Sequence, residues 1–254
     1  MLDDPAAPDA TNAPRTAPPA GQSLITLHHC VSARSFRVLW MLEELGLPYR
    51  LQMLPFPPRS HAREFLQTNP LGTVPAFFAG PVRMTESVAI CQYLATRSAP
   101  TPLNVEPHEP AFASYLQWLH FGEATLTFPQ TLVLRYERFE LPERRQPQVA
   151  TDYRRWFLAR LRTLEPLLAE EPYLCAGRFT AADVSVGYAL MLAGHLGMAT
   201  QFTPSVARYD QMLRERPAFQ RALAAQEKAA IEQGVPTTPA PDLGPPEPAR
   251  SSAS

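Results

Sequence analysis

Three absences narrow the kinds of protein that this sequence can encode. It contains only three cysteines, Cys30, Cys91 and Cys175, which lie far apart and without CxxC spacing. Such a set supports neither a disulfide framework nor a structural metal site, and it is typical of a reducing compartment. The formal net charge is −1, from 23 basic and 24 acidic residues. No bulk field therefore draws the chain to nucleic acid or to an anionic membrane, and any anion binding must be local.

Long apolar runs are also missing. No stretch approaches the length of a membrane span, and the N-terminus has neither the basic start nor the apolar core of a signal peptide. We therefore expect a cytoplasmic protein. The composition is that of an ordinary globular chain of 254 residues, 45% hydrophobic and 9% aromatic, which is enough for a sizeable core.

The 29 prolines are concentrated at the two ends of the chain and at one internal break. Residues 1–22 and 234–254 are rich in Pro, Ala, Ser and Thr and have almost no large apolar side chains. Burial cannot offset the entropy of ordering such segments, so we predict two disordered tails. The internal break, SAPTPLNVEPHEP, predicts a linker over residues 99–110 between domains at 23–98 and 111–233.

The most informative stretch runs from Asn69 to Arg97. Turn formers bracket two short apolar runs, and Thr85-Glu86-Ser87 then opens an apolar helical pattern, which predicts strand, turn, strand and helix. A cis Val74-Pro75 bond would turn the Val74 amide and carbonyl toward an extended peptide ligand. The helix start at Glu86-Ser87 could hold a small carboxylate. Either feature alone suits an edge-hairpin proline or a capping serine; together they favour a site for a small peptide-like anion.

The periodicity of apolar residues predicts different architectures before and after the break at residues 99–110. Before the break, the order is strand, helix, strand, short helix, strand, strand and helix, with a parallel pair joined through the first helix and an antiparallel hairpin. Beyond the break, every periodic segment is helical, with a bend at Phe128-Pro129. One of these helices begins at Thr180-Ala181-Ala182-Asp183, an N-cap followed three residues later by an acid.

Three segments together resemble a cytosolic glutathione S-transferase. They are SARSFRVLWMLEELGLPY, then NPLGTVPAF followed by TESVAICQYL, and FTAADVSVGYAL. The resemblance covers about residues 23–232. It implies an α/β plus all-α fold, in which a thioredoxin-like N-terminal domain binds glutathione and an all-helical C-terminal domain lends an acceptor pocket. It also implies a homodimer, a role in detoxification, and glutathione as co-substrate without a metal.

The resemblance assigns residues to the glutathione site. Val74, between Thr73 and a cis Pro75, would pair with the cysteinyl unit, and Glu86 with Ser87 would bind the γ-glutamyl carboxylate and amine. The glycyl carboxylate of such enzymes is met by a basic residue ahead of the NPxG turn, where Arg59 and His61 are the candidates. Either could equally be a solvated loop charge.

The chemistry requires the glutathione sulfur as a thiolate, because the anion is the nucleophile. A hydroxyl just before the first helix would donate to that sulfur, and the helix dipole would add to the effect. Ser32 lies five residues ahead of Arg37, which matches the catalytic hydroxyl of serine-type members. Ser35, which suits an N-cap, and Cys30, which suits a part-buried apolar position, are the alternatives.

The acceptor site and the reaction follow from the same resemblance. Tyr115, Trp118 and Phe121 fall on the helix that lines the acceptor pocket in this family. The leading hypothesis is a glutathione transferase acting on a small hydrophobic electrophile. Two alternatives are a glutathione-dependent isomerase of the maleylacetoacetate type and a non-catalytic glutathione-binding or scaffold protein with proline-rich tails.

Overall fold

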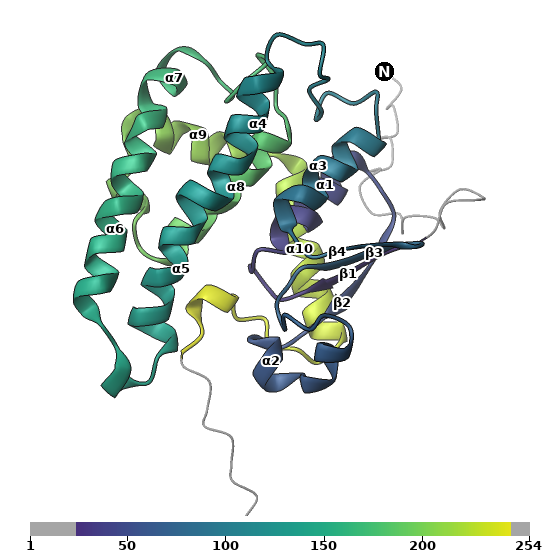
Figure 1. Ribbon diagram of the computed structural model, residues 1–254, viewed down its shortest axis with the longest axis vertical. Helices are drawn as coiled ribbons and strands as arrows, with labels where there is room; N and C mark the ends of the chain where they lie inside the picture. Colours follow the sequence, from purple (N-terminus) through teal and green to yellow (C-terminus); the bar gives the residue numbers. More distant parts are fainter. Residues whose placement is uncertain (1–23, 245–254) are drawn as a thin grey trace, which may run out of the picture.

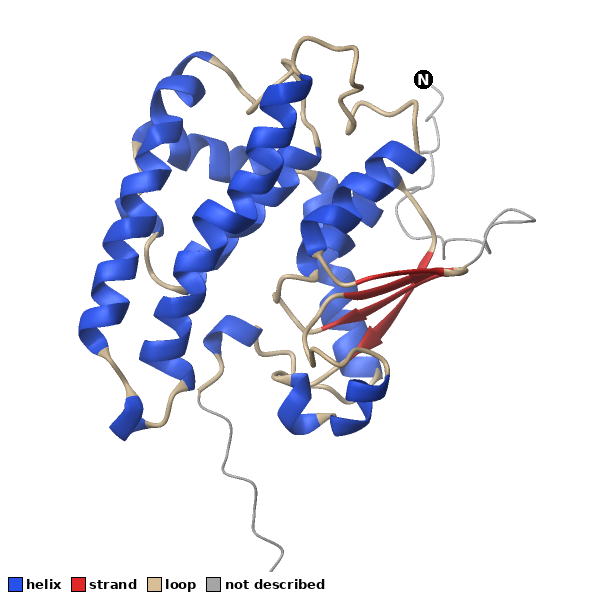
Figure 2. Ribbon diagram, in the orientation of Figure 1, coloured by secondary structure: helices blue, strands red, loops and turns tan. Residues whose placement is uncertain are grey.

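A computed structural model describes residues 24–244 of the chain. The predicted tail over residues 1–22, and the last ten residues of the one predicted over 234–254, lie outside the described residues. A small sheet forms one side of the molecule and a set of helices forms the other (Figure 2). This arrangement confirms the predicted α/β plus all-α fold class.

Four strands form the sheet in the order β2-β1-β3-β4. They are β1 (Ile25–His29), β2 (Tyr49–Met53), β3 (Ala76–Ala79) and β4 (Val82–Met84). β1 and β2 run parallel, whereas β3 is antiparallel to both β1 and β4. The predicted parallel pair and antiparallel hairpin are therefore both present.

Three helices accompany the sheet: α1 (Phe36–Leu45), α2 (Pro58–His61) and α3 (Ser87–Arg97). A 3-10 turn over Arg63–Gln67 follows α2. α1 and α3 pack together on one side of the sheet, and α2 lies on the other (Figure 1). α1 ends where the sequence predicts, because Gly46 adopts φ +65°, a left-handed conformation that costs glycine little.

All the other helices follow α3. They are α4 (Phe112–His120), α5 (Phe128–Leu134), α6 (Pro147–Leu161), α7 (Glu165–Glu170), α8 (Ala181–His195), α9 (Pro204–Arg214) and α10 (Pro217–Glu232). A π-helical segment, η2 (Phe121–Thr127), joins α4 to α5, and another, η3 (Arg135–Phe139), continues α5. No helix or strand lies between α3 and α4, but the predicted domain limits at 98, 110 and 233 stay predictions.

α8 is the central helix of the C-terminal half. Every residue from Ala181 to Ala193 is buried. The predicted N-terminus is confirmed: Thr180 Oγ1 accepts from the Ala182 N–H, and Asp183 Oδ2 accepts from the Thr180 N–H at 2.8 Å. Asp183 also accepts from the Tyr209 hydroxyl of α9 at 2.7 Å, so the cap joins two helices.

The chain after α10 differs from the prediction. Residues 240–242, which fall within the predicted tail, contact both halves of the molecule. Ala240 is buried, and its N–H donates to the Val31 carbonyl at 2.8 Å. Asp242 contacts the Nδ1 atom of His195, at the end of α8, at 2.8 Å. The reason is local: Ala240 and Pro241 are small and apolar enough to enter a gap between the two halves, which their composition alone does not reveal.

Within the described residues, none of the helices has the length and apolar character that crossing a membrane would require.

Candidate functional site

The site begins at the end of β1, where the turn from Cys30 to Ser35 leads into α1. Ala33 of this turn and Val74, just before β3, belong to one small apolar cluster that Ala240 also joins. The cluster consists of Cys30, Ala33, Leu54, Ala62, Phe65, Val74, Ala76 and Ala240. The turn from Cys30 to Ser35, the residue Val74 just before β3 and the C-terminal segment at Ala240 therefore meet at one place.

Val74 presents the features that a peptide ligand would use. The Val74-Pro75 peptide bond is cis, as the sequence predicts. Val74 is 8% exposed, yet neither its N–H nor its carbonyl forms a hydrogen bond with any residue that the structure describes. Neighbouring Thr73 is exposed, and its carbonyl already accepts from Asn69 Nδ2 at 2.7 Å. Buried backbone groups are almost always paired, so the free Val74 pair is available for a ligand.

The start of α3 lies where the sequence predicts. Glu86 is the exposed N-cap, and the buried Ser87 is the first helical residue. Ser87 Oγ accepts from Arg37 Nη1 at 3.2 Å, so its own hydroxyl proton stays free to donate. The exposed Glu86 carboxylate can pair with an ammonium group, and the unpaired N–H groups of the first turn can receive a carboxylate.

Arg59 and His61 both lie on α2 and both are exposed. The Arg59 Cβ lies 2.8 Å from where a Cβ on Gly72 would be, so Arg59 covers the NPxG turn. Arg59 forms no ion pair within the described part of the chain. Its guanidinium is thus free to meet a carboxylate beside that turn.

Ser32 does not point outward. It has φ +54°, is 3% exposed, and interacts with the side-chain amide of Gln226 on α10. Gln226 Oε1 accepts from the Ser32 N–H at 2.9 Å, and Gln226 Nε2 donates to Ser32 Oγ at 3.2 Å. These bonds stabilise a left-handed conformation that costs a non-glycine residue energy, and they direct the hydroxyl toward α10.

The two alternatives to Ser32 are also enclosed. Ser35 has no exposed surface, and its Oγ has no partner among the described residues. Cys30 likewise has no exposed surface; its Sγ lies 3.9 Å from the Pro55 carbonyl. Burial raises the pKa of the Cys30 thiol well above its usual range, so it stays protonated. Each of the three predicted candidates is therefore buried in this structure.

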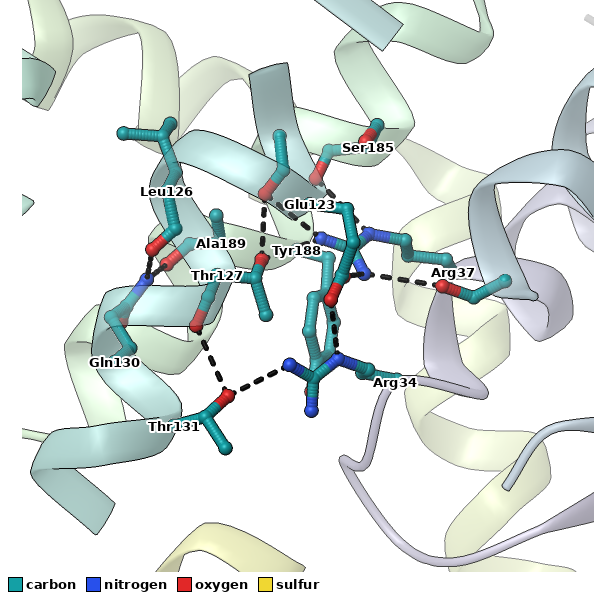
Figure 3. Close-up of polar contacts among 12 residues, drawn as sticks. Arg34, Arg37, Glu123, Leu126, Thr127, Gln130, Thr131, Ser185, Tyr188 and Ala189 are labelled. Atoms are coloured by element: carbon teal, nitrogen blue, oxygen red, sulfur yellow. Dashed lines mark hydrogen bonds and ion pairs between the residues drawn. The ribbon is translucent and has the colours of Figure 1, made fainter. Parts of the chain in front are cut away.

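Two arginines of the same turn and helix share one carboxylate (Figure 3). Arg34 Nε donates to Glu123 Oε1 at 2.7 Å, and Arg37 Nη1 donates to Glu123 Oε2 at 2.5 Å. We call Arg34, Arg37 and Glu123 the arginine cluster. It joins the start of α1 to η2, so it holds the N-terminal and C-terminal halves together.

Arg37 is fully buried, and all five of its N–H groups have partners. Besides Glu123 and Ser87 Oγ, it donates to the carbonyls of Ser185 and Gly122 and to Thr127 Oγ1. Gly122 allows this approach, because a Cβ there would lie 2.3 Å from Ser185 Oγ. A buried charge with every donor satisfied is the arrangement that a structural arginine requires.

The pKa values of Arg34 and Glu123 are shifted in opposite directions. Burial lowers the pKa of Arg34, but the Glu123 carboxylate outweighs it, helped by Tyr188 and Glu86, so the guanidinium pKa lies above its usual range. Burial raises the pKa of Glu123, but the charges of Arg37 and Arg34 outweigh it and hold that pKa below its usual range. Arg34 and Glu123 are therefore both charged at neutral pH.

The three predicted acceptor-pocket residues differ in how deeply they are buried. Tyr115 has no exposed surface and lies in the main core, where burial raises its pKa above its usual range. It is a core residue rather than a pocket wall. Trp118 and Phe121 are half-buried, with ring centroids 5.1 Å apart in an edge arrangement. Their role as pocket residues stays a prediction.

Roles for Arg34 and Gln226 in this site were not predicted from the sequence, and neither was the pairing of Glu123 with the two arginines. The one signal in the sequence for the cluster is the pair of arginines bracketing Phe36, since Arg37 is a charge inside an apolar helical run. Gln226 gives no such signal, because it lies 194 residues from Ser32 in an amphipathic helix that tolerates polar residues at many positions.

A small mixed sheet with a cis proline before its third strand, followed by a helical region, defines a thioredoxin-like domain joined to an all-α domain. Residues 31–97 match the family model described as "Glutathione S-transferase, N-terminal domain". The chain is 25% identical over 243 residues to Glutathione S-transferase 3 of Schizosaccharomyces pombe, covering 90% of this chain and 99% of the relative.

Solved structures agree with this match. The glutathione transferase URE2P6 from Phanerochaete chrysosporium, in complex with oxidized glutathione, has a TM-score of 0.71 and 26% identity, covering 82% of this chain and 98% of that one. URE2P5 from the same organism has a TM-score of 0.72 and 25% identity, covering 84% and 98%. Over most of its length, the chain is thus similar to cytosolic glutathione S-transferases.

Proposed function

We propose that this protein is a glutathione transferase. The observation that carries the proposal is that the Val74 N–H and carbonyl have no hydrogen-bond partner among the described residues. The start of α3 at Glu86-Ser87 supplies the other half of the proposed site. Val74 pairs with the cysteinyl unit of glutathione, Glu86 and Ser87 bind the γ-glutamyl amine and carboxylate, and Arg59 or His61 meets the glycyl carboxylate. Each contact matches a donor or acceptor with the group it suits.

The reaction is nucleophilic substitution by the glutathione thiolate. The thiol loses its proton to solvent, the sulfur attacks an electrophilic carbon, a C–S bond forms and the bond to the leaving group breaks. Ure2p5 from Phanerochaete chrysosporium was cocrystallized with 1-(S-glutathionyl)-2,4-dinitrobenzene, which is such a product. We propose a small hydrophobic electrophile as the acceptor and detoxification as the purpose.

The resemblance implies that the hydroxyl that donates to the glutathione sulfur belongs to Ser32, with Ser35 and Cys30 as alternatives. Ser32 Oγ accepts from Gln226, so its own proton remains free to donate. With 3% of Ser32 exposed, however, the turn must rearrange before that proton reaches a ligand.

Binding and turnover are tested separately. The wild-type protein is passed over immobilised glutathione and its melting temperature is measured with and without glutathione. It is then assayed for conjugation of 1-chloro-2,4-dinitrobenzene. We expect retention, a higher melting temperature and turnover. Absence of both retention and thermal stabilisation would overturn the proposal.

Two variants test the assigned site. Glu86→Gln and Ser87→Ala each remove one charge-assisted or polar contact, so each is expected to weaken glutathione binding by about ten- to hundredfold. Glu143→Gln, on an exposed residue of the 3-10 turn at Pro142–Arg144, is the control. Binding without turnover would favour the scaffold alternative, and turnover of maleylacetoacetate alone would favour the isomerase.

We also propose that the protein is a cytoplasmic homodimer. All three cysteines are buried and unpaired, which supports a reducing compartment. Leu71, before β3, and Phe128, at the start of α5, are large apolar residues with more than half of their surface exposed. Such residues are typical of protein interfaces. A monomeric mass by light scattering would contradict the dimer.

A further inference from the structure

The turn that leads into α1 has one polar side chain that is not enclosed. Cys30, Ser32 and Ser35 are buried, and Ala33 carries no polar group. The Arg34 side chain is 33% exposed. By elimination, Arg34 is the residue of this turn whose side chain can reach a bound ligand without rearrangement.

The Arg34 guanidinium keeps a free edge. Its Nε donates to Glu123 Oε1 and its Nη2 donates to Thr131 Oγ1, both at 2.7 Å. Nη1 forms no hydrogen bond with any residue in the described part of the chain. In Figure 3, these two bonds hold Arg34 beside η2 and α5, with its remaining nitrogen directed away from both partners. The side chain is thus oriented by the protein and still has donors to offer.

The charge around Arg34 is not balanced. The arginine cluster has two guanidiniums and one carboxylate, and every other partner of Arg37 is neutral. Tyr188, whose ring lies 4.3 Å from the Arg37 guanidinium carbon, adds no charge, because burial raises the pKa of its hydroxyl to about 12. Glu86, on the approach to α3, is a further acid that acts on Arg34. It is exposed, and glutathione's ammonium group neutralises it when bound.

We propose that Arg34 stabilises the thiolate of bound glutathione, in place of a hydroxyl. This inference rests on the proposed function. The thiol proton passes to solvent, and the sulfur anion accepts a hydrogen bond from Arg34 Nη1. The thiolate then attacks the acceptor carbon as the leaving group departs with its electron pair. A fixed cation favours the charged form of a neighbouring thiol more than a neutral hydroxyl does.

The decisive measurement is the pKa of the bound thiol, followed by the ultraviolet absorbance of the thiolate as pH is varied. Arg34→Gln is expected to raise that pKa by about 1–2. At pH values below the thiol pKa, each increase of 1 in that pKa is expected to lower kcat/KM about tenfold, because the thiolate fraction falls by the same factor. Affinity for S-methylglutathione, which has no thiol to ionise, is expected to change less than threefold. Arg34→Lys retains the positive charge, so its bound thiol pKa is expected to lie close to the wild-type value.

Glu123→Gln separates an electrostatic role from a structural one. It removes the carboxylate that neutralises part of the cluster, so the bound thiol pKa is expected to fall, although the protein becomes less stable. A purely structural role for the Arg34–Glu123 pair would move the thiol pKa the same way in both variants. Arg154→Gln is the matched control, because Arg154, like Arg34, donates to one carboxylate, of Glu137, and to one neutral oxygen, here the carbonyl of Leu196.

Two results would overturn the inference. One is a thiol pKa that is unchanged in Arg34→Gln but raised in Ser32→Ala. That result would show that the Ser32 hydroxyl, and not Arg34, stabilises the thiolate. The other is an unchanged or raised thiol pKa in Glu123→Gln, which also decides the matter if Arg34→Gln does not fold. Neither result would count against the proposed function of the protein as a glutathione transferase. Failure of the wild-type protein to bind S-methylglutathione would instead count against the proposed function.

Discussion

The side-chain amide of Gln226 binds the N–H and the hydroxyl of Ser32, although 194 residues separate them. Its Oε1 also lies 3.0 Å from His29 Nε2. Because Oε1 accepts hydrogen bonds from the Ser32 N–H and from His29 Nε2–H, the amide nitrogen of Gln226 must face Ser32 Oγ. A residue of the last helix therefore determines the conformation of the turn that begins the site.

Replacing Gln226 tests this relationship. Gln226→Leu leaves the buried Ser32 N–H without a partner, so we expect unfolding free energy to fall by about 2–3 kcal/mol in urea denaturation. Gln233→Leu is the matched control: Gln233 also bridges to the N-terminal half, through the Met53 N–H and the Leu51 carbonyl, but it is exposed. It should cost about 1 kcal/mol or less. Equal losses in the two variants would contradict a special role for Gln226.

His29 predicts how stability depends on pH. It is fully buried, and burial lowers its pKa from 6.5 to about 4 in spite of the bond to Gln226. The unfolded chain therefore binds a proton below pH 6.5 that the folded chain does not bind until about pH 4. Stability contributed by the neutral ring is present above pH 6.5 and is lost as pH falls toward 4, by up to about 3 kcal/mol.

The measurement is urea denaturation from pH 7 to pH 4. His29→Gln removes the titrating group, so its stability should fall less steeply over this window, even if it is lower at pH 7. His120→Gln, on an exposed residue at the end of α4, should keep the wild-type slope. An unchanged slope in His29→Gln would show that other groups govern the acid sensitivity.

The C-terminal segment is expected to contribute to stability. Ending the chain after Gly234 removes the Ala240–Val31 hydrogen bond, the burial of Ala240 and the contacts of Asp242. We expect a loss of about 1–3 kcal/mol, measured by urea denaturation. Asp242→Asn removes only the partly exposed ion pair with Arg138 and the carboxylate contact with His195, and it should cost about 1 kcal/mol or less. A truncated chain as stable as the full one would mean that this packing is incidental.

The sequence by itself determined the elements whose causes are local. Gly46 ends α1 because a left-handed residue is needed one position beyond the helix, and Thr180 with Asp183 starts α8 through bonds that span three residues. The alternation and helical periods predicted the parallel pair, the hairpin and the helical half. The approach to β3 at Val74 and the start of α3 at Glu86 were also predictable, because turn formers and caps mark them.

Only the tertiary structure decided which side chains of the turn face outward. Ser32 and Arg34 are two residues apart in similar sequence surroundings, and either could present its polar group to a ligand. Ser32 faces inward because its φ is positive and Gln226, from the last helix, binds it. Arg34 stays partly exposed because Glu123 and Thr131, from the helical half, hold it at the surface. Contacts between residues so far apart in the chain leave no local pattern, so they appear only when the two halves are packed together.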